Sequence, residues 1–216
     1  MQRLVFTILM VIGMSVLPAA GATVIVDGTS NTFLIGETPS PSSPVCVDVT
    51  PFGPGSRLRF FGDGSVRTVS GGPEYGPDGA STNNVYSYTT NTENLSAIIA
   101  PWGSLVGVFV DSAASPVPPA LDYWTNPNSR NFATQSPLLQ QTFFIGDGTS
   151  NTLLFQETVV PMGATCLYLG VADSERNWSD NTGSFTVDVS AVPVPGALLL
   201  LGSGLVGLAG MRRKFY

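Results

Sequence analysis

An eight-residue segment occurs twice in the chain, almost unchanged and 120 residues apart. The first copy begins at Asp27 and reads Asp-Gly-Thr-Ser-Asn-Thr-Phe-Leu, and the second begins at Asp147 and ends in Leu-Leu instead. Apolar residues precede both copies, and Asp-Gly supplies the backbone angles that tight turns require. We therefore predict a hairpin, strand–turn–strand, in each copy. The alternative is a calcium loop, but the spacing of its oxygen ligands matches no familiar calcium loop.

Strand-like segments recur about every ten residues between the two copies and after them. Polar and apolar residues alternate at 57–61 and 184–189, and apolar runs occur at 97–100 and 105–110. Gly (24) and Pro (17) are abundant, and no useful helical pattern occurs between the two ends of the chain. This pattern predicts an all-β fold, a single jelly-roll-like β-sandwich. The proline-rich segment 112–131 is predicted to be a long surface loop.

The first 22 residues have the parts of a secretory leader. Arg3 provides a basic start, an apolar run extends from Leu4 to Leu17, and Ala20 and Ala22 are the small residues of a cleavage site. The run is too short to span a bilayer comfortably, which argues against a transmembrane anchor. We predict a signal peptide over residues 1–22 and an exported domain over residues 23–191.

Residues 192–216 form a hydrophobic tail. Pro193 and Pro195 open it, an apolar stretch follows, and Arg212 and Arg213 lie near its end. About sixteen apolar residues at 1.5 Å each give ~24 Å, slightly less than the hydrocarbon core of a bilayer. The basic end would stay cytoplasmic, so the tail would hold the exported domain at the inner membrane. A plain single-span anchor is the alternative to a sorting signal.

The tail resembles the PEP-CTERM sorting signals, which have a Pro-x-Pro motif, an apolar helix and a terminal arginine cluster. Val194 stands where the commonest form has Glu, and matches a Val-Pro-x-Pro subtype. The resemblance implies recognition by an exosortase-type membrane transpeptidase. It also implies a place in the Gram-negative cell envelope and a link to extracellular polysaccharide. It covers only about the last 25 residues and implies nothing about the domain itself.

Charge and the absence of histidine exclude several functional classes. The exported domain holds five arginines and all fifteen acidic residues, so its net charge is −10. Such a surface repels nucleic acid and anionic lipid, and suits cations or simply solubility. The sequence contains no His, which removes the Ser-His-Asp arrangement and His-based zinc sites.

The chain has two cysteines, Cys46 and Cys166, which follow the two copies of the repeat at equivalent distances. Exported proteins meet an oxidising environment, which favours a disulfide between them. Two buried free thiols are the alternative.

A segment rich in oxygen donors lies between two predicted strands near the end of the domain. Asp173, Asn177, Asp180 and Asn181 fall within nine residues of one another. Calcium takes six to eight oxygen ligands from carboxylates, amides and backbone carbonyls. We therefore predict a Ca2+ site in this loop. The metal-free alternative is that these Asp and Asn side chains only cap turns.

This segment resembles the C-terminal part of the calcium-dependent galactophilic bacterial lectin and the small jelly-roll family around it. The resemblance implies a carboxylate ligand from Asp173 and a backbone carbonyl from Asn177. Asp180 and Asn181 take the family's paired-Asn positions, and Tyr75, in a Tyr-Gly-Pro segment, matches its tyrosine carbonyl ligand. Asp180 replaces an Asn, and the family's galactose-holding His and Gln have no counterpart here. The resemblance implies the fold and the calcium site more strongly than a sugar ligand.

A glycan at this loop is predicted to contact Asp173, Trp178 and Asn181. An exposed Trp178 could stack its indole on a sugar face. Burial of Trp178 against the edge of the sandwich is the alternative. Trp102, at the head of an apolar strand, is predicted to lie in the core, and Trp124 to pin the long loop. The sequence thus predicts a non-catalytic module that recognises extracellular glycan, and the alternative is a structural surface protein without a sugar ligand.

Catalysis is the third hypothesis. Paired carboxylates can hydrolyse glycosidic bonds, and the available pairs are Asp173 with Asp180 and Asp147 with Glu157. Their spacing does not separate catalysis from turn and ligand roles, so we do not predict an enzyme.

Overall fold

The computed structural model describes residues 21–34, 44–82, 85–87, 94–111, 116–174 and 178–193. Within these ranges the chain is built of β-strands, which confirms the predicted all-β class. The helical segments there are three short 3-10 helices: η1 (Thr32–Leu34), η2 (Pro127–Arg130) and η3 (Trp178–Asp180). None of the helices in the described ranges is long and apolar enough to cross a membrane. Asn177, most of the predicted signal peptide and most of the predicted sorting tail lie outside the described residues.

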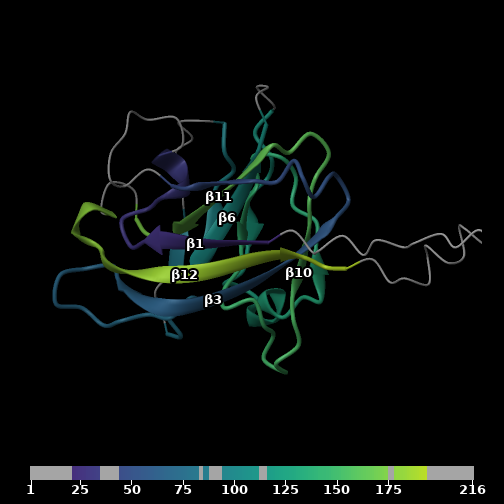
Figure 1. Cartoon of the computed structure of the whole chain (residues 1–216). Helices are drawn as coiled ribbons and strands as arrows, with labels where there is room; N and C mark the ends of the chain where they lie inside the picture. The colour runs from purple at the N-terminus through teal and green to yellow at the C-terminus, as the bar shows by residue number, and fades with distance from the viewer. Residues whose placement is uncertain are drawn as a thin grey trace, which may run out of the picture.

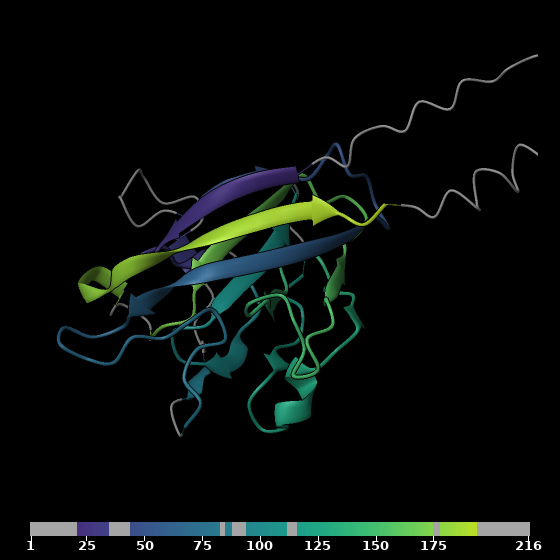
Figure 2. The same cartoon turned by 60° about the horizontal axis from the view of Figure 1, so that its bottom comes forward.

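The strands form three sheets. The first has the order β1 (Gly21–Asp27), β12 (Thr182–Ala191), β3 (Arg57–Arg67), β10 (Glu157–Val159) and β8 (Thr134–Gln135). The second has the order β2 (Cys46–Asp48), β11 (Cys166–Val171), β6 (Leu105–Val110) and β9 (Thr142–Phe144). The third has the order β4 (Val85–Ser87), β5 (Ile98–Pro101) and β7 (Leu121–Asp122). In Figure 1 the strands β1, β12 and β3 lie in front of β11 and β6, and Figure 2 shows the two sheets as stacked layers.

The core lies between the first two sheets. Along β12 the side chains of Phe185, Val187 and Val189 are buried while those of Thr186 and Asp188 are exposed, as the predicted alternation requires. Strand β6 is buried along almost its whole length, which is typical of a central strand covered on both faces. Large side chains that the second sheet adds to the same core are Phe109, Phe143, Leu167 and Leu169.

The predicted hairpins of the repeat are wrong. Strand β1, which leads into the first copy, pairs with β12, and β9, which leads into the second copy, pairs with β6. The two turns themselves are alike, because Asp27 and Asp147 each accept hydrogen bonds from the backbone N and the Oγ1 of the threonine two residues later. After the turn the first copy forms η1, and the second forms an isolated bridge between Thr149 and Phe155. In both copies the entering strand thus pairs with a strand outside the repeat, on the side where its apolar residues join the core.

The segment 112–131 also contains more structure than the predicted surface loop. Its described part includes β7, which pairs in parallel with β5, and η2. The Oδ1 of Asn126 caps η2 by accepting from the backbone N of Asn128. The proline content of a segment does not predict local hydrogen bonds of this kind.

The two ends of the described domain lie side by side. Gly21 pairs with Ser190 in the β1–β12 ladder, and the backbone N of Val192 donates to the carbonyl of Arg57. The other end of the same strands holds the first repeat turn and the start of β12, where Asp27 pairs with Ser184 and Thr182 pairs with Arg67. The predicted calcium loop therefore lies at the end of β12 that is remote from the point where the chain leaves the sheet.

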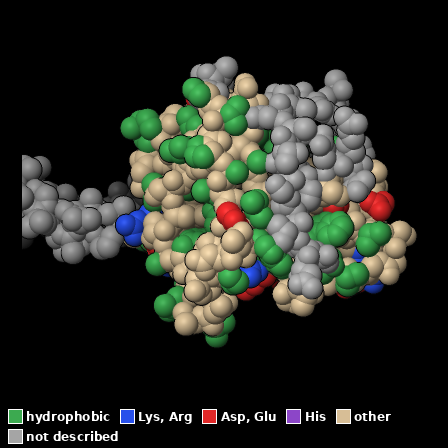
Figure 3. All heavy atoms as spheres, turned by 180° about the vertical axis from the view of Figure 1, so that it is seen from behind, with side chains coloured by type: hydrophobic (Ala, Val, Ile, Leu, Met, Phe, Trp, Pro, Cys, Tyr) green, Lys and Arg blue, Asp and Glu red, His purple; other side chains and the backbone are tan. Residues whose placement is uncertain are grey.

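The surface carries little charge on the face seen from behind, where hydrophobic side chains lie among uncharged polar atoms (Figure 3). This agrees with the 11% of charged residues in the sequence. Among the described residues, Val117, Leu138 and Met162 are exposed and, together with neighbouring prolines, line an apolar groove of about 480 Å³.

Candidate functional site

The candidate calcium loop is held in place by three backbone connections. The N of Val171, at the end of β11, donates to the carbonyl of Ser30 in the first repeat turn at 2.8 Å. Ala172, the next residue, exchanges two hydrogen bonds with the 103–104 turn, one to each residue and both 2.8 Å long. The N of Gly28 donates to the carbonyl of Gly183 at 2.9 Å, which ties the same repeat turn to the start of β12. These contacts fix the two ends of the loop that carries Asp173 and Asn181.

Asp173 is fully buried, with 0% of its surface exposed. Its Oδ1 accepts hydrogen bonds from the indole Nε1 of Trp102 and from the backbone N of Ser174, each 2.6 Å long. Burial raises the pKa of the Asp173 carboxyl, and the nearby charge of Asp180 raises it further. The hydrogen bonds from Trp102, Ser174 and Asn181 oppose this shift without cancelling it. A bound cation would supply the positive charge that an ionised carboxylate needs in this setting.

Asn181 is the second buried polar residue of the loop, with 5% of its surface exposed. Its Nδ2 donates to the carbonyl of Gly28 at 2.8 Å, which fixes the orientation of the amide. Its Oδ1 is buried and has no hydrogen-bond partner within the described part of the chain. A buried amide oxygen without a partner costs about 1–3 kcal/mol, so this atom is suited to an additional ligand.

Asp180 and Tyr75, two other predicted ligands, lie near Asp173 or near the turn that carries its partner Trp102. Asp180 is the last residue of η3, is exposed, and lies near enough to Asp173 to affect its ionisation. Tyr75 forms an antiparallel bridge with Val66, and its carbonyl accepts from the Val66 backbone N at 2.9 Å. The ring of Tyr75 lies against Gly103, where a Cβ would come within 2.8 Å of its Cδ2. This contact places Tyr75 beside the turn that carries Trp102.

Trp178, the predicted stacking residue, begins η3 and is half-buried. Its carbonyl accepts from the backbone N of Asn181 at 3.2 Å, so the indole belongs to the same short turn as the buried amide. A side-chain hydrogen bond thus joins Asn181 to Asp173, and Trp178 and Asp180 belong to the short turn that leads into Asn181. No group of three or more His, Cys, Asp or Glu residues that could hold a metal occurs within the ranges described above. Calcium at this loop would therefore depend on amide and carbonyl oxygens beyond the two carboxylates.

Trp102 is the site residue that sequence reasoning missed. It was predicted to lie in the core, but it is half-buried and its Nε1 is bonded to the Asp173 carboxylate. An indole N–H that is removed from water needs a hydrogen-bond acceptor. This requirement is the only feature of the sequence that could have indicated a polar partner for Trp102. Trp102 therefore positions Asp173.

Replacement of Asp173 by Asn tests the buried carboxylate through its pH dependence. A folded-state pKa raised above the unfolded value stabilises the fold fully below the unfolded pKa, and this stability is lost as pH rises through the folded pKa. In a chelating buffer, Asp173→Asn should therefore raise the midpoint of thermal unfolding by a few degrees at neutral pH and by much less at pH 3, relative to the wild type. Circular dichroism melts at both pH values measure this difference.

The matched control is Asp188→Asn, which removes an exposed carboxylate on β12 and should change the midpoint little in either buffer. The midpoints of Asp173→Asn and the wild type could instead differ by the same amount at neutral and acid pH. That result would show that the charge of the Asp173 carboxylate does not affect stability.

Asp147 and Glu157, the second carboxylate pair considered for catalysis, have structural partners. Glu157 forms ion pairs with Arg59 at 2.6 Å and with Arg57 at 3.1 Å. Burial opposes ionisation of Glu157, but the hydrogen bonds from Arg59 and Arg57 outweigh it and lower its pKa. Asp147 accepts two hydrogen bonds from Thr149 in the repeat turn. These contacts give both carboxylates a structural role.

The cysteines lie on adjacent strands of the second sheet. Cys46 on β2 and Cys166 on β11 form a disulfide with a Cα–Cα separation of 5.7 Å. In the β2–β11 ladder Cys46 is opposite Tyr168 and Cys166 is opposite Asp48, so the disulfide connects the strands diagonally.

The described residues thus form an all-β domain with a candidate cation-binding loop at one end of its long strands. No known family model matches the sequence, and no curated protein matches it. Among solved structures the chain is similar to one described as "EclA N-terminal domain; PllA-like lectin", with 16% sequence identity and a TM-score of 0.40. The similarity covers 79% of this chain and 95% of that chain. At these values the function of this chain has to be argued from its own residues.

Proposed function

We propose that this chain is an exported, non-catalytic envelope protein whose jelly-roll-like domain holds calcium at the loop from Asp173 to Asn181 and binds glycan there. The observation that carries the proposal is the buried Oδ1 of Asn181, which lacks a hydrogen-bond partner among the described residues. The Nδ2 of the same side chain is fixed on Gly28, so this oxygen cannot be satisfied by turning the amide over. A calcium ion accepts amide oxygens as ligands and would remove the penalty.

The donor set fits a calcium ion better than a transition metal. Asp173 and Asp180 supply negative charge, Asn181 supplies an amide oxygen, and the lectin resemblance adds the carbonyls of Tyr75 and Asn177. Oxygen donors alone suit hard cations such as calcium, whereas zinc and copper sites use His and Cys. The chain has no His, and its two cysteines are joined to each other.

Glycan binding at the loop follows from the same groups. Hydroxyl groups of a sugar can complete the oxygen shell of a calcium ion, and the half-buried Trp178 offers an aromatic face next to Asn181. The domain is proposed to be non-catalytic because the carboxylates of Asp147 and Glu157 are held by Thr149 and by two arginines.

Export and sorting rest on the two ends of the sequence. The leader at 1–22 would direct the chain across the inner membrane, and the tail at 192–216 would hold it there for an exosortase-type transpeptidase. Pro193, Pro195, Arg212 and Arg213 are the residues of the sorting motif. In a host that has such an enzyme, the mass of the mature protein would show loss of the tail, and retention of the arginines would reject the sorting role.

The calcium and glycan parts are tested together on the full chain in a detergent that has no sugar headgroup. A calcium concentration one hundred times the Kd should stabilise the fold by about 2.7 kcal/mol, a rise of roughly 5–10 °C in the melting midpoint relative to a chelating buffer. A glycan array in calcium should then show binding that chelator abolishes. Asp180→Ala should remove both effects, while Asp188→Ala, on the exposed face of β12, should keep them.

The outcomes separate the proposal from its alternative. An unchanged midpoint when calcium is removed and restored would reject the metal site. A calcium-dependent midpoint without binding to any saccharide at millimolar concentration would leave a structural surface protein. One observation favours that alternative: the hydrogen bond from Trp102 already gives Asp173 a structural role.

A further inference from the structure

A second polar hollow lies away from the candidate calcium loop. It has a volume of about 140 Å³, and none of its lining residues belongs to the calcium site. Pockets for drug-sized ligands have roughly 300–1,000 Å³, so this hollow suits a small ligand. Its polar lining is contributed by Asp78, Asn128, Arg130, Asn131, Thr149 and Asn151, around the ring of Phe144. Asp78 therefore meets two later segments here, 127–131 and 144–151.

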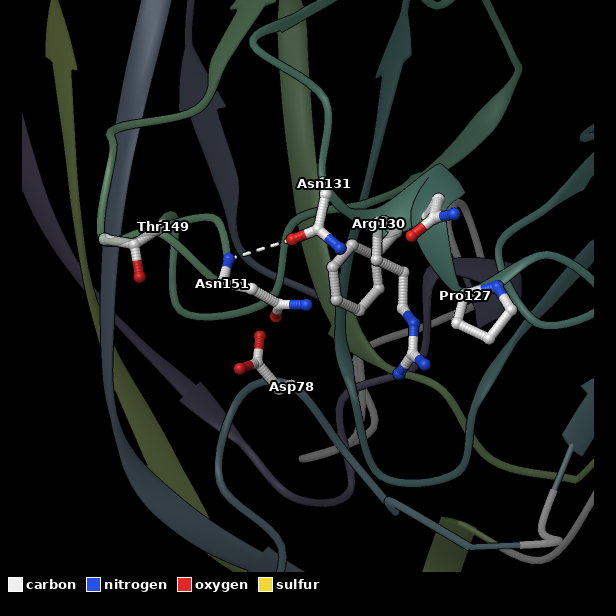
Figure 4. A pocket seen from close by; sticks show the side chains of 8 residues that line it. Asp78, Pro127, Arg130, Asn131, Thr149 and Asn151 are labelled. Atoms are coloured by element: carbon white, nitrogen blue, oxygen red, sulfur yellow. Dashed lines mark hydrogen bonds between the residues drawn. The ribbon is translucent and has the colours of Figure 1, made fainter.

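The walls of the hollow are fixed by hydrogen bonds to the backbone. The Oδ1 of Asp78 accepts from the backbone N of Asp147 at 3.1 Å, and the Oδ1 of Asn131 accepts from the backbone N of Asn151 at 2.8 Å. Figure 4 shows this second hydrogen bond, with Asp78 and Asn151 on one side of the hollow and Arg130 on the other. Asp78 and Asn131 are thus held in place before a ligand arrives, which lowers the entropy lost on binding.

Two side chains at the hollow make no ion pair or hydrogen bond to other described residues. The guanidinium of Arg130 forms no ion pair there, although it lies over the ring of Trp124 with 5.9 Å between its Cζ and the ring centroid. The side-chain amide of Asn151 is exposed and makes no hydrogen bond to another described residue, and only its backbone N is bonded to Asn131. A guanidinium donates several hydrogen bonds and an amide both donates and accepts, so the two side chains are suited to bind neighbouring hydroxyl groups of one ligand.

Charge indicates which ligands are favoured. One acid, Asp78, and one base, Arg130, line the hollow, so it has no net charge of its own. The domain around the hollow has a strongly negative net charge and would repel an anionic ligand. A neutral ligand with several hydroxyl groups can donate to Asp78 and accept from Arg130 at the same time.

We propose that the hollow between Asp78, Arg130 and Asn151 is a second, calcium-independent binding site for one neutral sugar residue. This site does not depend on the calcium loop, and it makes the domain bivalent for glycan if both sites are occupied. Two weak sites on one domain raise the effective concentration of a repeating polysaccharide at the second site.

The probes are the methyl glycosides of glucose, galactose and mannose, with sodium glucuronate as the anionic comparison. Saturation-transfer NMR is recorded on the full chain in EGTA, in a zwitterionic detergent without a sugar headgroup. At least one methyl glycoside should receive saturation in EGTA. Arg130→Gln and Asn151→Ala should each weaken its binding by about tenfold, since each removes hydrogen bonds to the ligand. Arg67→Gln, which breaks only an exposed ion pair with Glu74, is the matched control and should bind as the wild type does.

Three results would overturn the proposal: no transfer to any methyl glycoside in EGTA, transfer unaffected by both pocket variants, or binding of glucuronate alone. Binding that needs calcium and survives Arg130→Gln would overturn this site and leave the calcium-loop proposal intact. Sugar binding that persists in chelator, together with a melting midpoint that does not respond to calcium, would support this site and reject the calcium-loop proposal. Melting curves of each variant exclude loss of fold as the cause of lost binding.

Discussion

Reduction of the disulfide between Cys46 and Cys166 should lower the free energy of unfolding by about 5 kcal/mol. The two cysteines are separated by 120 residues, so the bond closes a loop that includes most of the domain. In the chain-entropy account of disulfides, the constraint on the unfolded chain grows with the logarithm of the loop length. Since domains of this kind have total stabilities of about 5–15 kcal/mol, the reduced protein should be close to unfolding at 37 °C.

Denaturant unfolding of the oxidised and reduced wild type measures this effect with the same side chains in both samples. The double variant Cys46→Ala/Cys166→Ala should match the reduced protein in midpoint and should no longer respond to reductant. Because Cys166 is buried, with 7% of its surface exposed, the double variant also loses a small amount of packing. A midpoint that is the same with and without reductant would contradict the expected role of the bond.

Replacement of Gly148 by Ala should destabilise the domain by about 2–5 kcal/mol. Gly148 has a φ of +86°, a left-handed conformation that costs L-residues roughly 1–2 kcal/mol. A Cβ at this position would also lie only 1.9 Å from the carbonyl oxygen of Phe60 in β3. The turn cannot move away easily, because the carbonyl of Asp147 accepts from the backbone N of Gly62 and that of Gly148 accepts from Gln156. Overpacking of this kind costs a further 1–3 kcal/mol or so.

Gly53→Ala is the matched control for this variant. Gly53 has a similar φ of +73°, but a Cβ there would meet no atom within 4 Å. It should therefore show only the conformational part of the loss, about 1–2 kcal/mol. Equal losses in the two variants, measured by thermal or denaturant unfolding, would show that the close approach to Phe60 is relieved at no cost.

The two copies of the repeat show what the sequence could and could not predict. The Asp-Gly turns are present, and in the first copy a Cβ at Gly28 would likewise lie 2.8 Å from the carbonyl oxygen of Thr182. The predicted hairpins are absent because β1 pairs with β12, more than 150 residues away in the chain. Local propensity identifies a turn and a strand, but the partner of a strand is decided by which apolar faces can be buried together.

Strand β3 illustrates the same limit at the level of one element. The alternation at 57–61 predicted its first half, but the strand continues to Arg67 through Gly62 and Gly64. Glycine inside a strand usually indicates an end or a bulge, since it has no side chain to pack. Here Gly62 is needed because Pro77, Leu105 and the carbonyl of Gly146 all approach it within 3.4 Å of a Cβ position.

The candidate calcium site was predictable only in part, for a similar reason. Asp173, Asp180 and Asn181 lie close together in the sequence, so spacing alone indicates a common loop. Trp102 lies about 70 residues earlier, and nothing in the pattern around it indicates the bond to Asp173. The hollow at Arg130 was not predicted at all, because its three wall segments are separate in the sequence and are brought together by the sheets.

The length of β12 separates the candidate calcium loop from the proposed tether. The strand has ten residues, and at about 3.3 Å per residue its two ends are roughly 30 Å apart. One end continues toward the hydrophobic tail, and the other begins beside Asn181. If the proposed tail anchors the protein, a tether attached after residue 193 would start from the end of β12 that is remote from the loop. In the proposed anchored protein, the acidic loop could then face polymers outside the cell rather than lipid headgroups.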